Sequence, residues 1–91
     1  MTRKVSALLD ATDSVATALQ NMKAGDTITV QRDDVIYPVI LRENIPLGRK
    51  FAVRDIVKGT EIREYGLPIG RALRDIRAGE LVDAHNCSIY S

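Results

Sequence analysis

Only one stretch of the chain places its hydrophobic residues at helical spacing. Thr12 or Asp13 offers a side-chain oxygen to the free amides of a helix start, and Gly25 follows where helices commonly end in a left-handed conformation. The pattern predicts a helix of about three turns that buries one face. The apolar residues that share this face are Val15, Ala18, Leu19 and Met22.

Strand patterns lie on both sides of this predicted helix. The apolar run at residues 4–9 predicts a first strand, residues 27–31 alternate polar and apolar side chains, and residues 35–43 are rich in branched side chains. The polar residues 32–34 read as a tight turn, so the last two strands are expected to form a hairpin. Pro38 lacks an amide donor, which places the second strand at a sheet edge or interrupts it there.

One phrase is repeated in the second half of the chain. Ala-Val-Arg-Asp-Ile-x-x-Gly-x-x-Ile at residues 52–62 returns as Ala-Leu-Arg-Asp-Ile-x-x-Gly-x-x-Val at residues 72–82, and a weaker copy lies at residues 18–28. Asp55 and Asp75 are expected to accept a hydrogen bond from an amide two or three residues further on, and the following glycine permits a positive φ. The phrase therefore predicts a corner, and its aspartates are interpreted as structural.

These patterns predict a single domain that is mainly β with one α-helix, an α+β fold. The 91 residues have room for one modest core, and a net charge of +1 argues against a nucleic-acid partner. There is no Trp and one Phe, so a stacking platform for bases is not expected. No run resembles a membrane span or a signal peptide, and the single cysteine, Cys87, has no partner for an intrachain disulfide. A cytoplasmic location is expected.

Spaced Gly, Pro, Asp and His residues agree in order with one known family. Ile-Pro-x-Gly-x-Lys-x-Ala begins at Ile45, Tyr-Gly-x-Pro-Ile-Gly-x-Ala begins at Tyr65, and Asp-Ile-x-x-Gly-x-x-Val-x-x-His-Asn begins at Asp75. This block resembles the SAF-type domain of altronate and galactarate dehydratases, which also occurs as a separate small subunit of altronate dehydratase and of sulfolactate sulfo-lyase. Residues 13–19 resemble the opening helix of that family. The resemblance implies one SAF-like domain over residues 1–91.

The resemblance also implies a β-clip fold and a cytoplasmic enzyme of sugar-acid or sulfo-acid catabolism. The reaction is an elimination, in which a proton leaves the carbon beside a carboxylate and a hydroxyl or sulfite leaves the neighbouring carbon. The resemblance implies Fe²⁺ in the holoenzyme, where a metal polarises the leaving group or the carboxylate; whether this chain ligates it is left open. The implied partners are a large catalytic subunit and a small carboxylate substrate, with no nucleic acid and no membrane.

The chain departs from the family pattern at several positions. The family usually has His at Arg49 and Lys at Glu64, often has a further His at Asp83, and commonly has a His near Asp10. One histidine, His85, remains where relatives show several. Asp10 and Asp83 can still act as carboxylate ligands, and Arg49 can hold a substrate carboxylate by a bidentate pair.

The candidate site residues follow from this block. His85 is the catalytic candidate, because histidine moves protons or binds metal near neutral pH, and Asn86 can orient it or the substrate. Arg49 and Lys50 lie beside a turn and suit a carboxylate or sulfonate. The alternative for His85 is a histidine bonded to backbone, and for Arg49 and Lys50 a solvated basic pair. For Tyr65 it is half-buried packing, and for Asp13 and Ser14 a helix cap. The substrate-binding set is completed by Tyr65, Asp13 and Ser14.

Two functions from different classes follow. The first is a small subunit of a carbon–oxygen or carbon–sulfur lyase that acts on a sugar acid such as altronate and is inactive without its large subunit. The second is a free-standing SAF-like module that binds a sugar acid, a sulfonate or a protein without catalysis, for which the missing histidines are the reason. A third possibility, a role in assembly, rests on the edge strand that carries Pro38.

Overall fold

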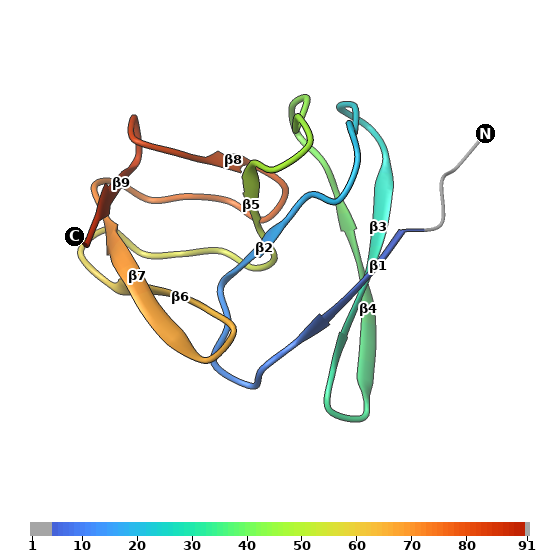
Figure 1. Cartoon of the computed structure of the whole chain (residues 1–91), viewed down its shortest axis with the longest axis horizontal. Coiled ribbons are helices and arrows are strands. Elements are labelled where there is room, and N and C mark those ends of the chain that lie inside the picture. The colour runs from blue at the N-terminus through green and yellow to red at the C-terminus, as the bar shows by residue number, and fades with distance from the viewer. Residues whose placement is uncertain (1–4, 91) are drawn as a thin grey trace.

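The computed structural model describes residues 5–90, with side chains from residue 9 onward. This part of the chain forms nine strands and no helix (Figure 1). Nothing within residues 5–90 is therefore a helix able to span a membrane. The strands are β1 (Val5–Leu9), β2 (Val15–Thr17), β3 (Thr27–Arg32), β4 (Val35–Ile40), β5 (Lys50–Ala52), β6 (Glu61–Glu64), β7 (Leu67–Ala72), β8 (Leu81–Val82) and β9 (Cys87–Ile89).

Three small sheets follow one another along the molecule (Figure 1). The sheet β1-β3-β4 lies at the right of the view, β2-β5-β8 at the centre and β6-β7-β9 at the left. β1 runs parallel to β3, and the other strand pairs are antiparallel. The central sheet is built from strands of both chain halves, so it joins the two outer sheets into one body.

Two hydrophobic clusters flank the central sheet. In β2, Ala16 belongs to the first cluster and Val15 to the second, and in β5 the same division separates Phe51 from Ala52. Because neighbouring residues of a strand point to opposite faces, each of these short strands supplies both cores. The first cluster also holds Ile28, Val30, Leu41 and Ile45, and the second holds Ile56, Ile62, Ala72, Ile76 and Cys87.

The predicted helix is wrong. Val15 and Ala16 are both buried although they are neighbours, and they pair with Ala52 and Phe51 of β5. Leu19, which the helical stripe would bury, is 76% exposed. An extended strand can bury two successive residues against two cores, whereas one stripe of a helix faces a single core. Pairing with a strand 33 to 37 positions away overrides the local pattern, so the fold is all-β in the described residues and not α+β.

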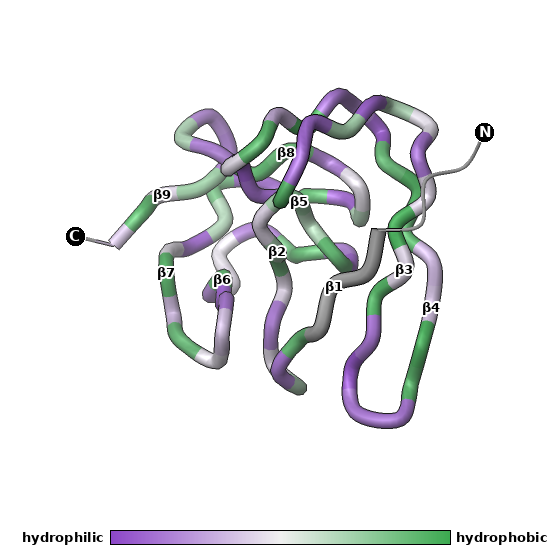
Figure 2. Tube along the Cα trace, turned by 45° about the vertical axis from the view of Figure 1, so that its right-hand side comes forward, coloured by the Kyte–Doolittle hydropathy of each residue, from purple (hydrophilic) through white to green (hydrophobic). Residues whose placement is uncertain are grey.

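The predicted hairpin is confirmed. β3 and β4 pair antiparallel from Thr27↔Ile40 to Arg32↔Val35, with Asp33 and Asp34 in the turn. β4 is an edge strand of its sheet, which explains why it accommodates Pro38. Figure 2 shows the hydrophilic turn of this hairpin beside hydrophobic residues of β4. The first predicted strand is also found, as β1, although residue 4 lies outside the described residues.

Four corner segments with one backbone pattern connect the strands. They are residues 19–26, 42–49, 53–60 and 73–80, and in each a bend is followed by a single β-bridge residue and a turn. The first two flank the β3–β4 hairpin and the last two flank the β6–β7 hairpin, so a strand–corner–hairpin–corner–strand unit occurs twice. We call residues 15–52 the first unit and residues 50–82 the second unit; β5 belongs to both.

The corner segments of each unit close on one another. Met22 bridges Ile45 in the first unit, and Ile56 bridges Ile76 in the second, each through two backbone hydrogen bonds of 2.7–2.9 Å. The glycine N–H of every corner donates to the carbonyl of the residue just before the opposite corner, at 2.8 Å in all four cases. All four glycines, Gly25, Gly48, Gly59 and Gly79, have φ between 85° and 91°.

A side-chain acceptor completes each closure. In the second unit, Asp75 Oδ1 accepts the Lys58 N–H at 2.8 Å, and Asp55 Oδ1 accepts the Ala78 N–H at 3.0 Å. These amides belong to the opposite corner, so the prediction that each aspartate bonds an amide of its own phrase is wrong. The corner-making role of the phrase is confirmed, but it depends on a partner phrase about 20 residues away in sequence.

Candidate functional site

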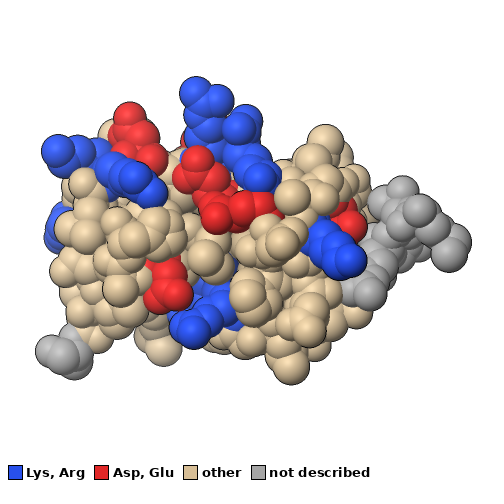
Figure 3. Space-filling view, turned by 90° about the horizontal axis from the view of Figure 1, so that it is seen from above, with Lys and Arg blue, Asp and Glu red and all other residues tan. Residues whose placement is uncertain are grey.

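A shallow cleft lies where the second corner segment and β5 face β8 and β9. Its free volume is about 200 Å³, and Arg49, Lys50 and Asp83 contribute the charged groups. Seen from above, this side of the molecule carries basic and acidic side chains close together (Figure 3). The rest of the lining consists of Gly48, Ile69, Val82, Cys87 and Ile89.

The two predicted cations are brought to the cleft, but each has a carboxylate partner. Arg49 Nη1 lies 3.4 Å from Asp83 Oδ2, and the Arg49 side chain remains 59% exposed. Lys50 Nζ lies 2.7 Å from Glu64 Oε1, where Glu64 is only 4% exposed. Thr17 Oγ1 donates to the other oxygen of the same carboxylate. The charge of Lys50 is therefore largely committed to a buried partner, and Arg49 is the cation that a ligand can reach.

His85 and Asn86 follow Asp83 in the turn between β8 and β9. The Asn86 side chain is 1% exposed; its Oδ1 accepts the Asp83 N–H at 3.0 Å and its Nδ2 donates to the Leu81 carbonyl at 2.8 Å. Asn86 thus holds the turn and does not orient the histidine. His85 is exposed, forms no hydrogen bond or ion pair with residues 5–90, and does not line the cleft.

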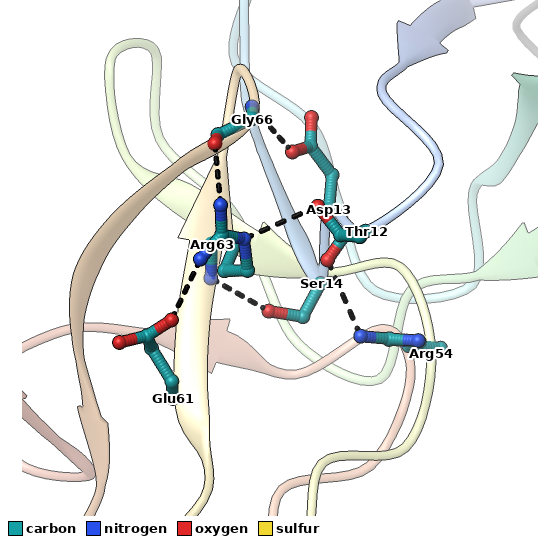
Figure 4. A network of polar contacts seen from close by, with 7 residues as sticks. All are labelled: Thr12, Asp13, Ser14, Arg54, Glu61, Arg63 and Gly66. Atoms are coloured by element: carbon teal, nitrogen blue, oxygen red, sulfur yellow. Dashed lines mark hydrogen bonds and ion pairs between the residues drawn. The ribbon is translucent and has the colours of Figure 1, made fainter.

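Tyr65, Asp13 and Ser14 lie together in a different region, at the β6–β7 turn. The buried Asp13 carboxylate accepts the N–H groups of Tyr65 at 3.0 Å and Gly66 at 2.8 Å. Ser14 Oγ accepts the N–H of Arg63 at 3.0 Å (Figure 4). The expected helix cap is wrong, since the residues serve a hairpin turn instead. Tyr65 is 68% exposed and not half-buried.

The guanidinium of Arg63 links this turn to the segment before β2. Its Nη2 donates to the Gly66 carbonyl at 2.6 Å and its Nε to Thr12 Oγ1 at 3.1 Å. Figure 4 shows Glu61 on the other side of the same guanidinium and Arg54 at the Thr12 carbonyl. Sequence reasoning missed the bonds of Arg63 to Thr12 and of Glu64 to Thr17, because these partners lie 51 and 47 residues away in sequence.

The described residues do not fit a metal site. No three His, Cys, Asp or Glu side chains among them converge in a way that could hold an ion. Asp10 lies beside Gly66 and Asp83 pairs with Arg49, so the two carboxylates considered as ligands belong to different regions. Protein sites for divalent ions normally bring at least three ligands together. No chemical step in this chain is therefore assigned to a metal.

Cys87 is a buried part of the second cluster, at the floor of the cleft. Burial raises the pKa of its thiol; the charge of Asp83 adds to this rise, and a hydrogen bond from the Arg71 backbone opposes it. A raised thiol pKa leaves little thiolate at neutral pH. The interpretation of Cys87 as unreactive agrees with this environment.

Comparison with known proteins identifies the family. The altronate/galactarate dehydratase SAF domain family matches residues 5–89. The chain is 45% identical over 78 residues to altronate dehydratase of Escherichia coli (strain K12), covering 86% of this chain and 15% of that protein. It is 31% identical over 74 residues to altronate dehydratase of Bacillus subtilis (strain 168), covering 81% of this chain and 14% of that protein.

A third relative has a similar length to this chain. The chain is 34% identical over 80 residues to the (2R)-sulfolactate sulfo-lyase subunit alpha of Chromohalobacter salexigens, and the match covers 85% of both. The same domain therefore occurs as a small part of altronate dehydratases and as most of a separate subunit. With the family match over nearly all described residues, the chain belongs to the altronate/galactarate dehydratase SAF domain family.

Proposed function

We propose that this chain acts as the small subunit of a cytoplasmic sugar-acid lyase, adding anion-binding residues to an active site that a larger chain completes. The proposal rests on how much of each relative the match covers. The match covers 15% of the E. coli altronate dehydratase, but 85% of the sulfo-lyase subunit named alpha. A domain found both fused and separate is expected to work beside the same kind of catalytic chain. The cytoplasmic part of the proposal is supported by the single free cysteine.

The cleft supports a contribution to a shared site better than a complete one. A sugar acid carries several hydroxyl groups, and each needs a hydrogen-bond partner when it leaves water. Ile69, Val82 and Ile89 offer none, so the cleft alone has polar partners only at its rim. Arg49 at this rim suits the substrate carboxylate. The hydroxyl-bearing carbons then require groups from another chain.

The proposed division of labour follows from which groups are available. Arg49 exchanges Asp83 for the substrate carboxylate. His85, exposed outside the cleft and two residues after Asp83, is the proton carrier that this chain supplies to the shared site. The Fe²⁺ that the family resemblance implies is assigned to the larger chain, because the described residues offer no ligand cluster. When bound, such an ion polarises the leaving group or the carboxylate.

An exchange experiment tests the proposal and separates its two substrate classes. The sequence of this chain replaces the matched 78 residues of the E. coli altronate dehydratase, and in parallel the whole chain replaces subunit alpha of the C. salexigens sulfo-lyase. Turnover of altronate or of sulfolactate is measured against each unaltered enzyme. We expect activity in the altronate dehydratase exchange, where identity is higher. Inactivity of both folded hybrids contradicts the proposal.

The binding-module alternative is tested on the isolated chain. Calorimetry with altronate and with sulfolactate should show no saturable binding below millimolar concentration, because the cleft is incomplete. Saturable binding that Arg49→Ala abolishes, with Arg42→Ala as a matched control on a neighbouring exposed arginine, would favour a free-standing binder instead.

A further inference from the structure

Tyr65 has an unusual backbone conformation for its residue type. Its φ is 54° and that of Gly66 is 75°, and the two residues form the turn between Glu64 and Leu67. Two-residue hairpin turns with both φ values positive favour Asn-Gly, Asp-Gly or Gly-Gly. A bulky residue in this left-handed region is strained, because its Cβ approaches the following carbonyl.

The fold gains little from the tyrosine side chain in return. Tyr65 is 68% exposed and Leu67, at the other side of Gly66, is 65% exposed, so neither contributes substantially to a core. Asn at this position would fit the turn with less strain. Strained residues that the fold does not need occur preferentially at functional positions.

A buried polar network nevertheless fixes this turn in one geometry. Asp13, 1% exposed, accepts both turn amides, and Arg63 donates to the carbonyl of Gly66 at 2.6 Å (Figure 4). Burying a carboxylate is unfavourable unless hydrogen bonds compensate it, and here the bonds that do so are those that hold the turn. The tyrosine is thus presented to solvent on a rigid support.

We infer that Tyr65, with Leu67 beside it, is an anchor by which this domain docks on the larger chain of its lyase. Exposed aromatic residues held in a preset conformation are typical of the few positions that dominate protein interfaces, because little entropy is lost when they bind. The occupant is the larger chain, because the domain is covalently joined to one in altronate dehydratases and separate in a protein of its own length. This inference rests on the proposed function.

The test compares stability of the isolated domain with its docking in the active hybrid enzyme. Tyr65→Asn should leave the melting temperature of the isolated chain unchanged or raise it by a few degrees, since strain is relieved. In the hybrid altronate dehydratase, the same change should speed limited proteolysis between the domain and the rest of the chain at least tenfold. Tyr65→Phe should behave like the parent, because it keeps the apolar ring. Ile36→Asn, at a similarly exposed position of β4 (64%), is the control and should leave proteolysis unchanged.

The outcomes are separable. An active hybrid whose proteolysis is the same with Tyr65→Asn overturns the docking role and leaves the proposed function standing. A fall in the melting temperature of the isolated chain shows that the tyrosine is needed by the fold, which also overturns it. Loss of self-association in sedimentation of the isolated Tyr65→Asn chain would assign the turn to a second copy instead. Inactivity of the parent hybrid removes the proposed function and this inference with it.

Discussion

The two units have the same corner geometry but use different side chains at the position that closes it. In the first unit, Asn21 Oδ1 accepts the Leu47 N–H at 2.8 Å and Asn44 Oδ1 accepts the Ala24 N–H at 3.0 Å. In the second unit, Asp55 Oδ1 accepts the Ala78 N–H at 3.0 Å and Asp75 Oδ1 accepts the Lys58 N–H at 2.8 Å. A neutral amide and a carboxylate are both acceptors here. The aspartates of the repeated phrase are therefore explained by structure, without a catalytic role.

The units differ more in what surrounds their glycines. A Cβ placed on Gly25, Gly48 or Gly59 would have no described atom within 4 Å. A Cβ on Gly79 would collide with the carbonyl of Ile40, at the end of β4. The Gly79 carbonyl also accepts the Arg42 N–H at 3.0 Å. The last corner, residues 73–80, is therefore where the second unit contacts the first. The glycines of the other three corners have open space around them.

The largest effect is expected from Gly79→Ala. Strain at a φ of 91° adds to the collision with backbone, which cannot move aside, so the free energy of unfolding should fall by about 3 kcal/mol or more. Gly59→Ala, with a φ of 85° and open space, should lose about 1 kcal/mol. Urea unfolding of both variants provides the measurement. Equal losses would show that the last corner is not a contact between units.

A smaller effect is expected when a closing acceptor is removed. Asp75→Ala and Asn44→Ala each leave one corner amide without its side-chain partner, and the exposed position lets water replace it in part. Each should lower the free energy of unfolding by about 1 kcal/mol, with the carboxylate at the upper end of the range. Urea midpoints of the two variants, compared with Arg74→Ala as an exposed control, provide the check. A neutral result for one unit only would break the equivalence of the units.

Alkaline pH should weaken the second cluster. The pKa of the Cys87 thiol is raised in the folded chain, so folding favours the protonated thiol. Its contribution is complete below the thiol pKa of the unfolded chain and is lost as the pH rises through the folded value. Urea midpoints should therefore fall more steeply for the parent than for Cys87→Ser as the pH rises above about 8.5, the ordinary pKa of a cysteine thiol. Parallel curves would contradict this assignment.

The smallest effect is expected from exchanging the two acceptor types. Asp55→Asn together with Asp75→Asn should change the free energy of unfolding by less than about 0.5 kcal/mol, because the first unit already closes with amides. Turnover of the hybrid altronate dehydratase should also be unchanged. Loss of turnover without loss of stability would show that Asp55 and Asp75 have a functional role.

Part of the site was visible in the sequence because its residues are neighbours along the chain. Arg49 and Lys50 were predicted to bind anions and do lie at a cleft, beside Asp83. The commitment of Lys50 to Glu64 was not predictable, because the two residues come from different strands. The second corner, Asn44-Ile45-x-x-Gly48, has the same acceptor–apolar–x–x–Gly pattern as the others. It was missed because Leu41 and Arg42 stand where the other three copies have Ala followed by an apolar residue.

The sequence by itself determined the β3–β4 hairpin, the edge position of Pro38, the corners of the repeated phrase and the family. The hairpin, the edge strand and the corners depend on spacing within one short segment, where turn residues and missing donors act locally. The family resemblance depends on motifs spread along the chain. Tertiary structure alone decided that residues 15–17 are a strand, that the corners close in pairs, and that Asp13 holds the Tyr65 turn. These depend on partners tens of residues away, whose hydrogen bonds and burial outweigh weak local preferences.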